Sequence, residues 1–279
     1  GAILFLIGAV AAAALIYSYS KDLPDTAQLR NYEPPVMTRV HGGDGSILAE
    51  YSHERRLYLP SGAIPPLVKH AFISAEDKNF YTPNGVDPEG IARAVMVLLQ
   101  GQKHVQGAST ITQQVAKNFL VGSERSIERK IREALISFRI EAAYPKEKIL
   151  ELYLNEIYLG LGNYGIAAAA LNYFNKSVHE LTVAEVAYLA ALPKAPSDLN
   201  PFRQRERALD RRNYVIKRML DDGWISKEEA DKAKSEPLGV NPRALSPNTY
   251  VAGYFAEEVR RELLDRYGDK KLYEGGLSV

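Results

Sequence analysis

The chain has 279 residues, of which 46% are hydrophobic and 25% charged, with a formal net charge of +1 and no cysteine. This composition is globular, and the length suits one large domain or two small ones. A nucleic-acid partner is not favoured, because such domains usually carry a strong basic excess. Disulfides and thiolate metal sites are excluded because the chain has no cysteine.

Residues 2–19 form an apolar segment without a charged side chain. A helix needs roughly 20 apolar residues to cross a bilayer core, and Tyr17 and Tyr19 suit the interfacial belt. We therefore expect a transmembrane anchor over residues 1–20. A cleavable signal peptide is the alternative, but the apolar run is longer than a usual signal core and no small-x-small site precedes Lys21.

A linker and a short β-structure are expected next, over residues 21–60. Residues 20–35 are polar and contain prolines, as linkers commonly do. Residues 36–51 alternate around a Gly-Gly-Asp-Gly sequence, which is a strong signal for a β-hairpin. Residues 55–60 offer a further strand.

From Pro65 onward the apolar side chains recur at helical spacing. Helix N-caps are expected at Asp87, Ser109, Thr182 and Ser226. Thr182 and Ser226 should form capping boxes with Glu185 and Glu229. Glycines that end helices are expected at Gly101 and Gly223. The helix over about 124–142 should bury one apolar stripe, which consists of Ile127, Ile131, Leu135 and Phe138. The last stretch, residues 241–279, contains another helix and then the pattern of a strand.

The first candidate for chemistry is Glu76, which stands beside Asp77 at a helix end. Apolar Phe72 and Phe80 lie close in sequence, and such surroundings can raise the pKa of a carboxyl and make it an acid or a base. The alternative is a solvated Glu-Asp pair at a helix terminus.

The second candidate is the segment 106–120. Gly107 and Ala108 let a ligand approach the backbone closely, and the N–H groups of the helix start favour an anion. Lys117 lies one turn further along. Hydroxyls and amides are concentrated in the first turn, at Ser109, Thr110, Thr112, Gln113 and Gln114. An ordinary capped amphipathic helix, the alternative, explains Ser109 but not this concentration.

The third candidate is Glu133, which follows Arg129 and Lys130 by four and three residues on a helix. These cations should keep the carboxylate ionised. With Lys117 and the further cations Arg125 and Arg132, they suggest a site for a pyrophosphate. A divalent ion bridging Glu133 or Asp77 to phosphates would suit the preference of hard cations for oxygen. The alternative is a solvated charged face.

The chain resembles the glycosyltransferase domain, family 51, of bifunctional class A penicillin-binding proteins. The matching segments occur in the family's order, and they are AEDKNFYTPNGVDPEG (75–90), QGASTITQQVAKNF (106–119), RKIREALISFRIE (129–141), KEKILELYLNEIYLG (146–160) and AEVAYLAALPKAPSDLNP (184–201). The resemblance implies a mainly α, lysozyme-like domain over residues 61–245 with a small membrane-proximal second lobe. It also implies that residues 246–279 are a linker and the start of a truncated transpeptidase region.

The resemblance further implies that lipid II is polymerised into β-1,4 glycan strands with inversion at the donor and release of undecaprenyl pyrophosphate. Glu76 would be the general base, and Glu133 the second catalytic residue, acting with the cations at Lys117, Arg125 and Lys130 on the pyrophosphate. The cleft would also be lined or supported by Asp77, Ser109, Gln114 and Asn118. A divalent cation, Mg or Mn, would take part, held by Glu133 and Asp77.

The expected location is the bacterial inner membrane, with a single pass and the catalytic domain on the periplasmic side. Partners would be lipid II, the growing glycan strand, the bilayer and possible cell-wall synthesis proteins. Residues 94–105 suggest a membrane-facing segment, with a fully buried helix as the alternative. The chain departs from the family at Pro83, where His is usual, and at Ala108, where Gly is usual, and neither position touches the proposed base.

Two other functions compete with polymerisation. A peptidoglycan-cleaving enzyme on a related fold needs no pyrophosphate site, so Lys117, Arg125 and Lys130 argue against it. A non-catalytic anchored module that binds glycan or a division partner would not need Glu76.

Overall fold

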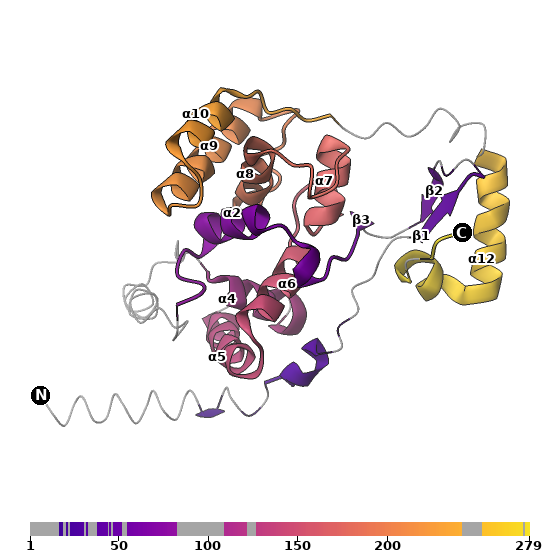
Figure 1. The fold of residues 1–279 in the computed structure, drawn as a ribbon. Helices are drawn as coiled ribbons and strands as arrows, with labels where there is room; N and C mark the ends of the chain where they lie inside the picture. Colours follow the sequence, from indigo (N-terminus) through magenta and orange to yellow (C-terminus); the bar gives the residue numbers. More distant parts are fainter. Residues whose placement is uncertain are drawn as a thin grey trace, which may run out of the picture. The chain divides into compact units, whose positions relative to one another are not determined.

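The computed structural model is mainly helical, as the sequence predicted (Figure 1). It describes residues 17–18, 21, 23–30, 32, 38–43, 45, 47–51, 55–82, 109–121, 127–241, 253–275 and 277–279. The predicted anchor before Tyr17, the predicted helix over 87–101 and the segment 94–105 fall outside these ranges. Within them, no helix combines the length and the apolar character that crossing a membrane requires.

The chain divides into two compact units, one formed by residues 1–32 and 76–153 and the other by residues 33–75 and 154–279. The first unit contains the 3-10 helix η1 (Thr26–Leu29), helix α4 (Ile111–Ala116), the π-helical turn η3 (Lys117–Val121), α5 (Ile127–Ala143) and most of α6 (Lys146–Glu156). The contact between α4 and α5 forms its centre. Because this unit contains both Glu76 and Glu133, it is the unit that carries the candidate site.

Helix α5 buries a different face from the one expected. Ile136 and Ile140 are fully buried, whereas Phe138 is 41% exposed and Ile131 and Leu135 are only half-buried. The predicted stripe was therefore wrong in its assignment of Phe138. Burial of the charged Glu133, one turn before Ile136 and Ser137, turns the helix away from the orientation that apolar content alone would select.

A buried polar bond joins α4 to α5. The Thr112 hydroxyl is fully buried and donates to Glu141 Oε1 at 2.6 Å, and Lys146 Nζ lies 2.9 Å from the same oxygen. A buried hydroxyl without such an acceptor would cost free energy. Thr112 therefore serves the packing of the two helices.

The helical part of the second unit contains the 3-10 helix η2 (Ser61–Ala63), α2 (Pro66–Glu76, whose last residue belongs to the first unit), α7 (Ile166–Phe174), α8 (Val183–Ala191), η4 (Leu192–Lys194), α9 (Arg205–Asp221) and α10 (Lys227–Ser235). Every residue of α8 from Ala184 to Ala191 is buried, and α8 contacts α7, α9 and α10. Small alanines allow this close packing on all sides. The helix is the core of this part of the unit.

The capping signals of the second unit are confirmed. Thr182 with Glu185 and Ser226 with Glu229 each form a reciprocal capping box. Gly223 has φ +79° and ends α9, because the N–H of the next residue reaches back to the carbonyl of Met219 at 2.9 Å.

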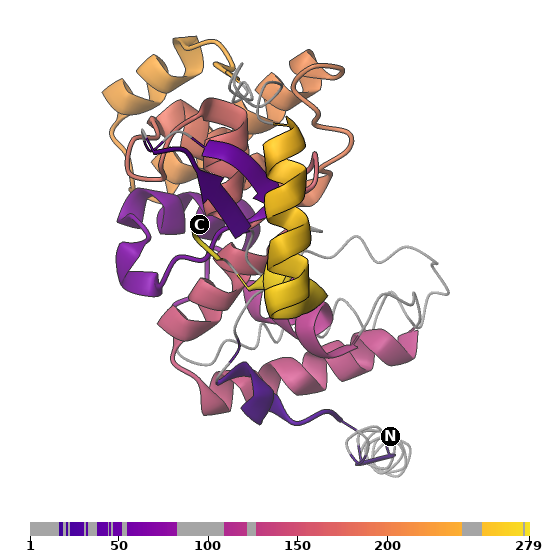
Figure 2. The ribbon, with the colours of Figure 1, turned by 90° about the vertical axis from the view of Figure 1, so that its right-hand side faces the viewer.

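The remaining part of the second unit joins segments that the sequence placed in separate regions. Strands β1 (Thr38–His41) and β2 (Ile47–Tyr51) pair antiparallel with a register shift after Val40. Figures 1 and 2 show the helix α12 (Gly253–Glu274) beside both strands, and Val40 packs with Leu263 and Leu272. The last residues, 277–279, run parallel to β1, with Arg39 N–H donating to the Leu277 carbonyl at 2.8 Å.

Two further features complete the described backbone. Strands β3 (Arg55–Arg56) and β4 (Asn163–Tyr164) pair in parallel. Helix α12 is broken at Gly268, whose φ of +78° is a conformation that glycine adopts at no steric cost.

Candidate active site

Glu76 and Asp77 lie at the C-terminal end of α2, where the chain turns toward Phe80. The N–H of Phe80 donates to the carbonyl of Asp77 at 2.9 Å, and the Phe80 ring is almost fully buried. This turn ends the helix and leaves both carboxylates half-buried. The sequence prediction that they share a helix end is confirmed.

The start of α4 is capped by Thr110 and not by Ser109, which corrects the expected N-cap. Thr110 Oγ1 accepts from the N–H of Gln113 at 3.1 Å, and Gln113 Oε1 accepts from the N–H of Thr110 at 3.3 Å. Asp77 Oδ2 accepts from the N–H of Ile111 at 3.2 Å. These bonds occupy N–H groups that were expected to favour an anion, so α4 offers less to a phosphate than the sequence suggested.

Glu76 is bonded directly to the segment that carries the polar cluster. Gln114 Nε2 donates to Glu76 Oε2 at 2.9 Å and lies 3.5 Å from the carbonyl oxygen of Ser109. A neutral donor orients a carboxylate without cancelling its negative charge. The arrangement therefore suits a proton acceptor.

Glu133 is held in the opposite way, by cations. Its carboxylate is 1% exposed, with Arg129 Nε 3.0 Å from Oε1 and Lys130 Nζ 2.5 Å from Oε2. The expected pairing is confirmed, and the alternative of a solvated charged face is wrong for Glu133. Buried carboxylates need this compensation because desolvation of an isolated charge is expensive.

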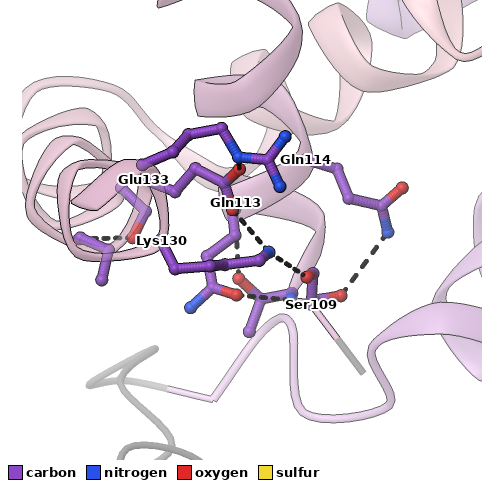
Figure 3. A network of polar contacts seen from close by, with 9 residues as sticks. Ser109, Gln113, Gln114, Lys130 and Glu133 are labelled. Carbon is purple, nitrogen blue, oxygen red and sulfur yellow. Dashed lines mark hydrogen bonds and ion pairs between the residues drawn. The ribbon is translucent and has the colours of Figure 1, made fainter. Parts of the chain in front are cut away.

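Lys130 connects the two carboxylate regions. Figure 3 shows its ammonium group between Glu133 and Ser109, and the distance from Nζ to Ser109 Oγ is 3.1 Å. Polar contacts thus run without a break from Glu76 through Gln114 and Ser109 to Lys130 and Glu133. The structure brings these five predicted site residues together.

Three other predicted site residues, Lys117, Asn118 and Arg125, are not among the five that these polar contacts join. Lys117 is the C-cap of α4 and the first residue of η3, and both it and Asn118 expose their side chains. Short π-helical turns often accompany functional sites. Arg125 lies outside the described residues.

Tyr153 is a residue that the sequence prediction missed. It lies on α6, is fully buried, and its pKa is raised well above the usual value, first by burial and then by the charges of Glu76 and Asp77. Its phenol therefore stays protonated close to both carboxylates. A signal was present, since Tyr153 follows Ile149 at helical spacing and so places a hydroxyl on an apolar face.

The carboxylates expected to hold a divalent cation are already engaged. Glu133 faces two cations and Asp77 accepts from the backbone of Ile111. In the part of the chain that the structure describes, no group of three or more His, Asp or Glu side chains could hold a metal ion. The described residues therefore do not fit a metal centre built by the protein.

Comparisons with known proteins identify the family to which this chain belongs. The family profile described as "Transglycosylase" matches residues 44–220. Penicillin-binding protein 1A of Rickettsia felis is 50% identical to this chain, in an alignment that covers all of this chain and 36% of the relative. Penicillin-binding protein 1A of Escherichia coli is 43% identical, in an alignment that covers 98% of this chain and 32% of the relative. The crystal structure of penicillin-binding protein 1A from Haemophilus influenzae has 30% identity and a TM-score of 0.51, over 89% of this chain and 27% of that one.

The chain therefore belongs to the transglycosylase family of enzymes and carries the glycosyltransferase domain of class A penicillin-binding proteins, as its motifs predicted. It spans about a third of the length of these curated relatives.

Proposed function

We propose that this chain polymerises lipid II into peptidoglycan glycan strands at the periplasmic face of the bacterial inner membrane. The observation that carries the proposal is the contrast between two neighbouring carboxylates. Glu76 is held by a neutral amide, whereas Glu133 is buried between two cations. One can accept a proton, and the other belongs to a charged cluster suited to a phosphate leaving group.

The proposed step begins with Glu76 taking the proton from the 4-hydroxyl of the acceptor GlcNAc. That oxygen forms a bond to the anomeric carbon of the donor MurNAc on one face of the sugar. The bond from this carbon to the pyrophosphate oxygen breaks on the other face, and its electron pair leaves with undecaprenyl pyrophosphate. The product is an inverted β-1,4 linkage.

The leaving group needs stabilisation of negative charge more than it needs a proton. Lys130 and Arg129 are fixed by Glu133, and Lys117 exposes its ammonium group on the neighbouring turn. Arg125 joins them in the proposal on the strength of the resemblance alone. Holding the cations in place before the substrate arrives reduces the reorganisation needed during the reaction.

Cleavage of existing glycan is the main competing function, and the same cluster argues against it. Glycosidases of the two-carboxylate type keep one carboxyl protonated as an acid. Glu133 is instead the shared ion-pair partner of Arg129 and Lys130. Glu133 therefore does not fit the acid of a cleaving enzyme.

A divalent cation, Mg or Mn, enters the proposal only as an ion carried by the phosphates of the substrate. Since Glu133 and Asp77 are engaged within the protein, we assign no chemical step to such an ion. Polymerisation should then depend on Mg or Mn through substrate binding. Titrating each ion into chelator-treated enzyme at several lipid II concentrations measures whether the change lies in KM or in kcat.

The deciding experiment incubates the purified chain with lipid II in detergent and separates the products by length. Wild type should form long glycan chains, and Glu76→Gln should form none while still binding lipid II. Glu206→Gln, at an exposed glutamate of α9, is a matched control that should keep the wild-type rate. Polymerisation by Glu76→Gln at a near wild-type rate would refute the base assignment.

A further inference from the structure

The two adjacent glutamines of α4 have different partners. Gln113 closes the capping box, because its Oε1 accepts from the N–H of Thr110. Gln114 Nε2 donates to Glu76 Oε2 at 2.9 Å, and Figure 3 shows the same amide group facing Ser109. Of the two amides in this turn, Gln113 therefore stabilises the start of the helix and Gln114 contacts the site.

We propose that Gln114 is a positioning residue for the base Glu76 and not a ligand of the substrate. The proposal rests on the function proposed above. It replaces the expectation, drawn from the resemblance, that Gln114 lines the cleft. The amide of Gln114 holds the Glu76 carboxylate in one orientation.

The amide nitrogen of Gln114 has two hydrogens to donate. One points to Glu76 Oε2 at 2.9 Å and the other has the Ser109 carbonyl at 3.5 Å. Both directions are thus used inside the protein. A substrate oxygen would have to displace one of these acceptors.

The backbones at both ends of this bond are fixed. Asp77 Oδ2 accepts from the N–H of Ile111, so the residue after Glu76 is tied to the first turn of α4, which also carries Gln114. The bond from Gln114 to Glu76 then connects two segments that are already held next to each other by the bond between Asp77 and Ile111. Little conformational entropy is lost in forming it, which favours its presence before the substrate binds.

A hydrogen bond donated to a carboxylate fixes the direction in which its oxygens point. Loss of the Gln114 donor should therefore let the Glu76 carboxylate rotate away from the position in which it meets the acceptor hydroxyl. Because a misplaced catalytic group slows the chemical step, the change should appear in kcat and not in KM.

The test compares Gln114→Met, which keeps the length but removes the donor, with Gln113→Met one residue earlier. Gln114→Met should lower kcat by roughly tenfold or more and leave KM for lipid II within about threefold. Gln113→Met should lower the melting temperature and reduce kcat far less than Gln114→Met does. A raised KM with an unchanged kcat in Gln114→Met would show a substrate ligand and overturn the proposal.

A second measurement separates this proposal from the proposed function. In 15N-labelled protein, the side-chain amide signals of Gln114 are assigned by their absence in Gln114→Met, and their hydrogen exchange is measured without substrate. Exchange should be slow in wild type and faster in Glu76→Ala, which removes the acceptor of the hydrogen bond. If wild type made no polymer, the proposed function would fail, whereas equal exchange of the Gln114 amide in the two proteins would overturn the positioning role.

Discussion

Replacing Glu133 with Gln should destabilise the first unit measurably, because the substitution keeps the shape of the side chain and removes its charge. The carboxylate is 1% exposed and pairs with Arg129 at 3.0 Å and Lys130 at 2.5 Å. The charge-assisted hydrogen bond from Lys130 contributes up to about 3 kcal/mol, and the Arg129 ion pair, whose two atoms do not form a hydrogen bond, adds less. Since the Lys130 side chain is 45% exposed and partly screened by water, we expect a loss of about 2 kcal/mol.

This loss corresponds to a fall in melting temperature of about 6 °C for a domain of this size. The assay is urea and thermal unfolding at neutral pH, followed by circular dichroism. The matched control is Asp231→Asn, which breaks a pair between Lys227 and Asp231 at 2.6 Å whose side chains are 80% and 59% exposed. That control should leave the free energy of unfolding almost unchanged, because both side chains are screened by water. Equal losses in the two variants would refute the argument that burial gives the Glu133 cluster its strength.

Three further predictions concern the fold around the site. Thr110→Ala removes the cap of α4 and should cost about 1 kcal/mol in urea unfolding, and a loss below that of the exposed control Thr82→Ala would contradict the cap assignment. Gly165→Ala should destabilise the fold far more than Gly223→Ala, although both glycines have a positive φ. A Cβ at Gly165 would lie 2.6 Å from the Asn155 carbonyl oxygen, whereas a Cβ at Gly223 would meet nothing within 4 Å. Similar melting temperatures for the two variants would be inconsistent with this. Tyr153 has a raised pKa in the folded state, so its contribution to stability is present below the ordinary tyrosine value of about 10 and is lost as pH rises above it, when the unfolded chain releases the proton first. The free energy of unfolding should therefore fall above pH 10 more steeply in wild type than in Tyr153→Phe, and parallel curves would argue against the burial of the phenol.

The signals that predicted local structure correctly depend on a few neighbouring residues. The capping boxes at Thr182 and Ser226 and the helix end at Gly223 were predicted from sequence and are present. Each is a closed set of hydrogen bonds within four residues, so no distant part of the chain can change it. The pairing of Glu133 with Arg129 and Lys130 is local in the same sense.

Predictions that depended on distant partners were less complete. Ser109 has a suitable side chain for an N-cap, but its hydroxyl accepts a hydrogen bond from Lys130 of α5, and Thr110 caps α4 instead. Phe138 belongs to a regular apolar stripe, yet α5 turns so that Glu133 is buried and Phe138 is exposed. For Ser109, a polar contact made across the fold outweighed a preference that the segment shows by itself. Glu133 pairs within α5, and the face that this helix buries depends on its packing against α4.

The assignment of roles to the two glutamates follows from what neutralises each one. Spacing along the chain identified both residues, but spacing cannot say whether a carboxylate meets a neutral donor or a cation. The neutral amide of Gln114 orients the carboxylate of Glu76. The cations at Glu133 are held in place by its carboxylate. A base and a phosphate-binding cluster can therefore be linked through one residue, because Gln114 and Lys130 reach the shared Ser109 from opposite sides.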